Sequence, residues 1–247
     1  MSLFEAQHLH KRFGDTVVLE DITVSFEENC VSGIMGPNGA GKTTCFNVLT
    51  GHYKPDRGKV LFDGEDITGL PERVIARKGI SRSFQIMNVF DDYSVLQNVM
   101  VALPEVRRRG FNMFLNVAND SEIQDKAWDV LKKIGLEEHA VQDAKDLSYG
   151  NKRILEIGIA LAAAPRLLFL DEPTQGLGSD QTARLAELIQ ELRKLTTLVI
   201  IEHDMPFLFG LADTISVIHW GQVIARGTPN ELKQNKWVQS SNLGKLE

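Results

Sequence analysis

A glycine-rich segment, Gly36–Thr44, carries the clearest chemical pattern in this sequence and reads GPNGAGKTT. Its glycines let the backbone turn tightly, so that successive main-chain N–H groups can point at phosphate oxygens. Lys42 can place its ammonium between the two terminal phosphates, and the Thr43 hydroxyl can ligate Mg²⁺. A chance match is disfavoured by the strand-like run before the segment and the helix-like run after it. The pattern predicts a site for ATP or GTP formed by Gly36, Pro37, Asn38, Gly39, Ala40, Gly41, Lys42, Thr43 and Thr44.

A second set of candidate residues follows the apolar run Leu167–Leu170, which ends in Asp171 and Glu172. In open α/β sheets, side chains at the carboxyl ends of strands face the ligand crevice. Asp171 is placed to hold Mg²⁺ through a water, and Glu172 could accept a proton from the water that attacks the terminal phosphate. Acidic pairs at strand ends are often only solvated turns, but the phosphate loop earlier in the chain favours the catalytic interpretation.

A third apolar run, Leu198–Ile201, ends in Glu202, His203 and Asp204. A lone histidine is most often a surface residue or a hydrogen-bonded core residue. This one ends a strand beside the two strands already implicated, so its side chain can face the same crevice. As a hydrogen-bond donor, His203 could contact the terminal phosphate or orient the attacking water.

The elements that position these residues alternate along the chain. Short alternating or β-branched runs over residues 3–62 predict a β-rich edge sheet that leads into the phosphate loop. Apolar residues at helical spacing predict helices over residues 91–165, with Gly135 as a stop signal. From Arg166 onward, apolar strands alternate with helices again, which is typical of a parallel sheet covered by helices.

Composition is that of an ordinary globular protein, with 43% hydrophobic and 24% charged residues. A chain of 247 residues can bury a large core, and we expect one elaborate α/β domain over residues 1–247. Its predicted parts are a nucleotide-binding core formed by residues 1–88 and 166–247 and a helical subdomain formed by residues 89–165.

Charge and cysteine content narrow the class of protein further. The formal net charge of −6 argues against a nucleic-acid partner. Cys30 and Cys45 are interpreted as small buried residues in a reducing compartment, not as a disulfide. The longest apolar stretch, 154–170, is interrupted by charged residues and a proline, so we expect no membrane span. Action at a membrane would then require a separate anchor.

A further segment, Leu147–Asn151, reads LSYGN and heads an apolar helical run. By itself it is an ordinary helix cap. Together with GPNGAGKTT, Gln85, LLFLDEP and His203, in that order, it resembles the ATPases of ATP-binding cassette (ABC) transporters across essentially the whole chain. The resemblance implies a P-loop ATPase with a parallel-sheet core, an antiparallel β edge sheet and an inserted helical subdomain.

The resemblance also assigns roles to residues. Phe13 resembles the aromatic residue on which adenine stacks, with Val18 packing nearby, and the less favoured alternative is that Phe13 is an ordinary core residue. Gln85 is similar to the glutamine that ligates Mg²⁺ and senses the membrane domain. The family's signature motif closes over the ATP of the opposite subunit in a head-to-tail dimer, and here its residues are Ser148, Gly150 and Asn151.

The sequence departs from the family pattern in three places. Tyr149 replaces the second glycine of the signature, and Asn151 replaces its glutamine. After Glu172 the family usually has an aspartate in a loop that signals across the dimer, and here Gly178 ends the segment QGLG. We expect the signature to function with altered contacts.

A finer resemblance links the chain to ATPases that drive import of branched-chain or other hydrophobic amino acids. It rests on the segments 82–85, 89–90, 94–98 and 242–244. Related urea-importer and lipopolysaccharide-exporter ATPases share much of this pattern and stay as alternatives, as does a soluble ABC ATPase without a transport role. The apolar residues Ile86, Met87, Val89 and Phe90 suit a groove floor that a partner covers.

The implied partners are integral-membrane permease subunits, a second ATPase subunit (itself or a paralogue) and, indirectly, a substrate-binding protein. The implied cofactors are ATP and Mg²⁺. The implied location is peripheral, at the cytoplasmic face of the inner membrane.

Overall fold

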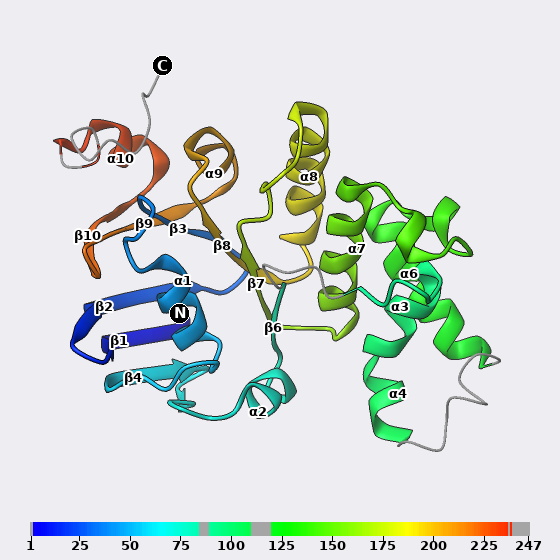
Figure 1. Ribbon diagram of the computed structural model, residues 1–247, viewed down its shortest axis with the longest axis horizontal. Coiled ribbons are helices and arrows are strands. Elements are labelled where there is room, and N and C mark those ends of the chain that lie inside the picture. Colours follow the sequence, from blue (N-terminus) through cyan, green and yellow to red (C-terminus); the bar gives the residue numbers. More distant parts are fainter. Residues whose placement is uncertain (1, 84–88, 110–119, 237, 239–247) are drawn as a thin grey trace.

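The computed structural model describes residues 2–83, 89–109, 120–236 and 238, and its strands form one mixed sheet (Figure 1). The strands are β1 (Ser2–Phe13), β2 (Thr16–Glu27), β3 (Val31–Met35), β4 (Arg57–Phe62), β5 (Glu65–Asp66), β6 (Ile80–Arg82), β7 (Leu167–Asp171), β8 (Thr197–Glu202), β9 (Thr214–His219) and β10 (Gln222–Gly227). Their order across the sheet is β5-β4-β1-β2-β10-β9-β3-β8-β7-β6.

One half of the sheet is parallel and central to the molecule. Strand β3 pairs in parallel with β8 and β9, and β7 pairs in parallel with β8 and β6. Every residue of β3, β7 and β8 is buried. Strands covered on both faces require continuous apolar runs, which explains the two runs that predicted β7 and β8. The predicted α/β fold class is confirmed.

The other half of the sheet is antiparallel. Strands β1 and β2 form a long antiparallel pair, and β4 and β5 extend it beyond β1. Strand β10 is antiparallel to β9 and meets β2 through a bridge between Gln222 and Asp21. This bridge makes the predicted edge sheet continuous with the parallel core.

Helices lie on the sheet and in a separate group beside it. The α-helices are α1 (Lys42–Leu49), α2 (Glu72–Arg77), α3 (Val95–Ala102), α4 (Pro104–Arg109), α6 (Ser121–Ile134), α7 (Tyr149–Ala162), α8 (Ser179–Leu192), α9 (Met205–Leu211) and α10 (Pro229–Gln234). Helices α3, α6 and α7 pack on one another to one side of the sheet (Figure 1). Helix α6 ends at Gly135 in the left-handed conformation, as its sequence predicts.

Two hydrophobic clusters meet at the parallel strands. In β7, Leu168 and Leu170 face the cluster that includes the helical group, whereas Leu167 and Phe169 face the cluster under β1, β2 and α1. Because side chains alternate along a strand, β7 joins both clusters and fixes its carboxyl end between them. Cys45 is buried as predicted, but Cys30 is partly exposed, because it lies in the turn before β3 and not within the strand.

Candidate functional site

The phosphate loop joins β3 to α1, and close backbone approaches require two of its glycines. A Cβ at Gly36 would overlap the carbonyl oxygen of Ile218. Gly41 has a φ of 98°, and a Cβ there would lie 2.9 Å from the carbonyl oxygen of Val18. Helix α1 begins directly behind the loop at Lys42, so the positive end of the helix dipole faces it.

Lys42 lies inside this loop. Its Nζ donates to the carbonyl oxygens of Gly36, at 2.8 Å, and Pro37, at 3.1 Å. Burial lowers the pKa of Lys42, while the nearby carboxylates of Glu172 and Asp171 act in the opposite direction. The ammonium therefore faces the acidic end of β7, where the terminal phosphate of a nucleotide could take over its hydrogen bonds.

The structure brings the acidic pair and the histidine together. Asp171 ends β7, opposite Ile201 of β8. Burial, reinforced by the charge of Glu172, raises the pKa of Asp171 to about 6. The Nδ1 of His203 lies 3.6 Å from Glu172 Oε1, and the imidazole is about half exposed at 51%. Glu172 and His203, the predicted proton acceptor and phosphate contact, thus share one edge of the sheet.

Arg153 contacts the acidic turn, although its sequence context did not indicate a site residue. From α7, its Nη2 donates to the carbonyl oxygens of Asp171, at 2.6 Å, and Glu172, at 2.9 Å. Its Nε donates to the carbonyl oxygen of Pro173 at 3.3 Å, and its Nη1 pairs with Glu156 at 2.6 Å. The signal in the sequence was an Arg and a Glu three residues apart within an apolar helical run.

Glu202 is a second residue whose role the sequence did not reveal. It is fully buried, and its Oε1 accepts hydrogen bonds from the N–H (2.9 Å) and the hydroxyl (2.6 Å) of Thr174. Its Oε2 accepts from the N–H groups of His203, at 3.0 Å, and Asp204, at 3.4 Å. This carboxylate fastens the loop after β7 to the loop after β8. An acidic residue that ends an apolar strand immediately before His203 was the available signal.

The signature segment caps α7 and contacts the loop after β7. The hydroxyl of Ser148 accepts the N–H of Asn151 at 3.2 Å, which is the predicted helix cap. Gly150 is buried, and a Cβ there would lie 2.7 Å from Gln181 Nε2. The Asn151 side chain accepts from Arg184 at 3.2 Å.

Two departures from the family pattern lie side by side. The hydroxyl of Tyr149 donates to the carbonyl oxygen of Gln175 at 3.1 Å. Its ring also covers Gly176, where a Cβ would lie 3.0 Å from Tyr149 Cε1. The tyrosine in the signature therefore occupies the space beside the glycine-containing loop after β7.

Val18 lies against Gly41 of the phosphate loop, and Phe13 is the last residue of β1. Phe13 is 44% exposed, and its ring meets Tyr53 edge-on at 5.3 Å between centroids. The exposure contradicts the alternative that Phe13 is an ordinary core residue. Val18 is half-buried, with its Cγ1 3.6 Å from the position of a Cβ at Gly41.

The predicted magnesium ligands are only partly described. Thr43 is exposed at the start of α1, and Asp171 is buried opposite the loop, so both offer oxygen donors of the kind that Mg²⁺ prefers. Gln85 lies outside the described residues. Within the described ranges, no group of three or more His, Cys, Asp or Glu side chains could hold a metal. This donor set fits an ion that keeps several waters and phosphate oxygens as ligands.

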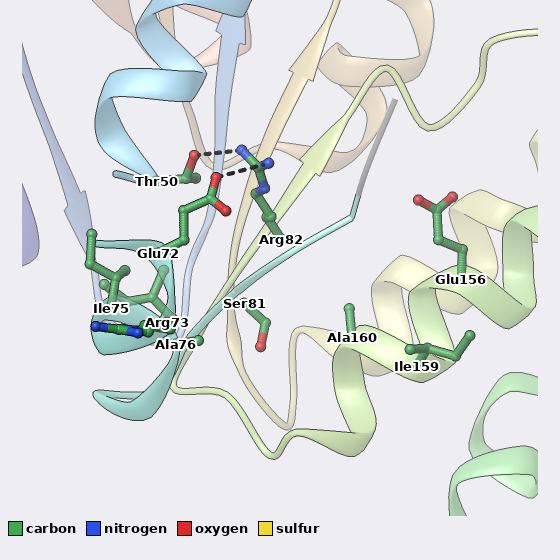
Figure 2. Close-up of a pocket in the computed structure, with 11 residues that line it drawn as sticks. Thr50, Glu72, Arg73, Ile75, Ala76, Ser81, Arg82, Glu156, Ile159 and Ala160 are labelled. Atoms are coloured by element: carbon green, nitrogen blue, oxygen red, sulfur yellow. Dashed lines mark hydrogen bonds and ion pairs between the residues drawn. The ribbon is translucent and has the colours of Figure 1, made fainter. Parts of the chain in front are cut away.

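A cavity of about 400 Å³ opens between α2, β6 and α7 (Figure 2). Glu72 from α2 and Glu156 from α7 lie on opposite sides of it, and Arg82 of β6 lies between them (Figure 2). Arg82 pairs with Glu72 at 3.0 Å and donates to Thr50 at 3.1 Å. The rest of the lining is polar at Arg73 and Ser81 and apolar at Ile75, Ala76, Ile80, Ile159 and Ala160. The predicted groove residues Ile86 and Met87 lie outside the described residues.

Comparisons with known proteins agree over nearly the whole chain. The family described as ABC transporter matches residues 19–175. The high-affinity branched-chain amino acid transport ATP-binding protein LivG of Escherichia coli K12 is 39% identical over 98% of each chain. The lipopolysaccharide export system ATP-binding protein LptB of Acidithiobacillus ferridurans is 34% identical over 98% of this chain and 97% of its own.

A solved structure supports the same relationship. An ATP-binding cassette of an ABC transporter in its ADP conformation superposes with a TM-score of 0.87 at 29% identity, covering 99% of this chain and all of that one. Among the described residues, no helix is both long enough and apolar enough to cross a membrane.

Proposed function

The chain belongs to the ABC transporter family, and from this premise we propose that it is the ATP-hydrolysing subunit of an importer for branched-chain or other hydrophobic amino acids. The main evidence for amino acids as the transported substrate is the 39% identity of the chain, over 98% of both chains, to a branched-chain amino acid transport ATP-binding protein. The lower identity to the lipopolysaccharide export protein, 34%, leaves that substrate as the second candidate.

ATP binding is assigned to the phosphate loop and the antiparallel edge of the sheet. The main-chain N–H groups of residues 36–44 would hold the phosphates, with Lys42 as their counter-charge. Adenine would stack on Phe13, whose ring is exposed at the end of β1. Thr43, Gln85 and Asp171 would hold Mg²⁺. When bound, this ion neutralises charge that develops on the phosphates during transfer.

Hydrolysis is assigned to the ends of β7 and β8. Glu172 would take a proton from the attacking water, and His203, 3.6 Å away, would donate a hydrogen bond to the terminal phosphate. Both residues directly follow neighbouring parallel strands, so the sheet brings the two groups to the same edge.

Two sites would form in a head-to-tail dimer with a second copy or a paralogue. Ser148 and Gly150, at the amino-terminal end of α7 where Ser148 is exposed, would close over the ATP held by the other subunit, with Asn151 adjusting the contact. ATP binding would favour the closed dimer, and hydrolysis would release it, because the terminal phosphate supplies the difference in affinity.

The cavity between α2, β6 and α7 is the proposed contact for a cytoplasmic helix of the permease. Its apolar residues Ile75, Ile80 and Ile159 suit burial against such a helix, and its charged residues Glu72 and Arg82 suit a polar rim. The permease would hold the chain peripherally at the cytoplasmic face of the inner membrane, and a substrate-binding protein would act through the permease. A nucleic-acid partner is not part of this proposal, because the net charge is −6.

Reconstitution tests this function directly. In vesicles that contain the permease and the substrate-binding protein, ATP hydrolysis should rise when leucine, isoleucine or valine is supplied, and should not rise with urea. Stimulation by urea or by lipopolysaccharide alone would replace the amino-acid assignment. Indifference to every membrane partner would contradict the transport function.

A further inference from the structure

We propose that Arg153 is a positioning residue for ATP hydrolysis, and that Glu156 transmits occupation of the cavity to it. Arg153 would hold the main chain of residues 171–173 so that the Glu172 carboxylate faces the attacking water. The second half of this inference rests on the proposed function, because it takes the permease as the occupant of the cavity.

The guanidinium makes an unusual set of contacts. Three consecutive carbonyl oxygens, those of Asp171, Glu172 and Pro173, accept hydrogen bonds from Arg153 at 2.6, 2.9 and 3.3 Å. A planar guanidinium presents its N–H groups in a fixed fork, so one side chain fixes the path of the whole turn. The contact reaches the main chain of the turn, so it sets where the Glu172 side chain points without touching the reacting atoms.

The backbone of Glu172 needs such support. Its φ is +43°, in the left-handed region that non-glycine residues rarely occupy. A conformation of this kind persists only where surrounding contacts over-determine it. Besides the fork of Arg153, the N–H of Glu172 donates to the carbonyl oxygen of Ile201 at 2.8 Å. The turn is thus fixed from β8 on one side and from α7 on the other.

Glu156 connects this fork to the cavity. Its carboxylate pairs with Arg153 Nη1 at 2.6 Å, and the two side chains are only 4% and 5% exposed. Buried ion pairs rarely add net stability over apolar residues of similar size, so stability alone does not explain this pair. Glu156 is also part of the cavity wall on α7 (Figure 2). A partner that changes the surroundings of this carboxylate would change the orientation of the guanidinium that it holds.

Helix α7 is well placed to link three sites. Its first turn carries the signature, its second carries Arg153, and Glu156, Ile159 and Ala160 follow on the cavity side. A displacement of this one helix would reach the dimer face, the acidic turn and the cavity together. Coupling of this kind requires a packed element that contacts each site. Helix α7 contacts the acidic turn through Arg153 and the cavity through Glu156, and its first turn is the signature.

The first experiment uses the full chain alone and separates kcat from KM for ATP. Arg153→Lys keeps the charge but cannot donate to three carbonyls from one plane. We expect kcat to fall by about 10- to 100-fold, the scale of a small misplacement of a catalytic group, with KM for ATP near that of the parent and a lower melting temperature, because buried carbonyl groups lose hydrogen bonds. Lys152→Met is the matched control, because Lys152 pairs with Asp91 at 3.1 Å, away from the acidic turn. It should retain the parent kcat.

Two results would overturn the positioning role. One is a parent-like kcat in Arg153→Lys. The other is an equal loss of kcat and of ATP affinity, which indicates general damage to the fold. If Arg153→Lys does not fold, Glu156→Gln tests the positioning role of Arg153 instead. Its isosteric amide weakens the ion pair with Arg153 and leaves Arg153 in place.

The second experiment uses the chain assembled with its permease and substrate-binding protein. Glu156→Gln should co-purify with the permease but lose most of the stimulation of ATP hydrolysis by transported substrate. Glu187→Gln is the control, because it is the same substitution at an exposed residue of α8 that does not line the cavity, and it should keep the ratio of stimulated to basal rate. Full stimulation of the Glu156→Gln complex would show that Glu156 is not the link.

The two experiments fail separately. An absence of stimulation in the parent complex would overturn the proposed transport function and the role of Glu156 with it. The kcat of Arg153→Lys, measured without the permease, would still decide whether Arg153 positions Glu172.

Discussion

The phosphate loop and the acidic turn face each other across the site, but they are held in different ways. In the loop, the charged side chain is held by residues close in sequence, because Lys42 bonds to Gly36 and Pro37, and the main chain of β2 and β9 packs against the loop from outside. The acidic turn after β7 depends on distant residues, namely Arg153 from α7 and Glu202 from β8. We infer that nucleotide binding is a local property of the sequence, whereas turnover depends on contacts that a partner can reach.

The sharpest test of this difference is Glu172→Gln, which should abolish turnover and leave binding intact. The amide keeps the shape of the side chain but cannot accept the proton of the attacking water, so kcat should fall by about 10²- to 10⁴-fold. The ATP-bound dimer should then accumulate and be detectable by size-exclusion chromatography. Glu187→Gln, an exposed residue of α8, is the control. A parent-like rate would show that another group is the base.

Gly36→Ala should show the opposite behaviour, with damage to the loop itself. The added methyl would overlap the carbonyl oxygen of Ile218, so the loop or β9 must move. We expect the free energy of unfolding to fall by about 1–3 kcal/mol, as for other overpacked sites, with weaker ATP binding by titration. Gly210→Ala in α9 is the control, since no atom lies within 4 Å of the new methyl. It should be neutral or stabilising by up to about 1 kcal/mol. Equal behaviour of the two variants would mean that the close approach at Gly36 is not rigid.

The same division decides what the sequence could predict. The apolar runs of β7 and β8, the stop at Gly135 and the cap at Ser148 follow from local patterns, and the structure contains all four. The meeting of Glu172 with His203 follows from one further rule, that the carboxyl ends of parallel strands share an edge.

Arg153 and Glu202 could not be predicted in the same way. In a sequence, a charged residue normally indicates a solvated face. Whether it is buried depends on groups far away along the chain, such as the carbonyl of Asp171 for Arg153, 18 residues away, and Thr174 for Glu202, 28 residues away. The partial exposure of Cys30 was missed for a related reason, because the start of β3 one residue later is set by pairing with β8.

A smaller effect is expected for base recognition, which belongs to nucleotide binding and not to turnover. Phe13→Ala should weaken ATP binding by about 1–3 kcal/mol, taking the scale of base stacking on aromatic residues. Phe13→Tyr keeps the stacking surface and should bind as the parent does. Because every base has a π-face, discrimination between ATP and GTP should be modest in both parent and variant. Isothermal titration measures each of these affinities, and an unchanged ATP affinity for Phe13→Ala would show that adenine does not stack on this residue.

Tyr149→Phe should have the smallest effect on kcat, and it tests a contact to the loop that follows the acidic turn. Only the hydroxyl that donates to the carbonyl oxygen of Gln175 is lost, and the ring stays against Gly176. The side chain is 46% exposed, so the lost bond is worth about 0.5 kcal/mol, or roughly a twofold fall in kcat with KM unchanged. Tyr93→Phe is the control, because its ring stacks on Phe90 and no hydroxyl bond of Tyr93 occurs among the described residues. A loss above about tenfold exceeds what one exposed hydrogen bond supplies. It would mean that the Tyr149 hydroxyl contacts the ATP of the opposite subunit, and that this end of α7 acts across the dimer and not only on its own acidic turn.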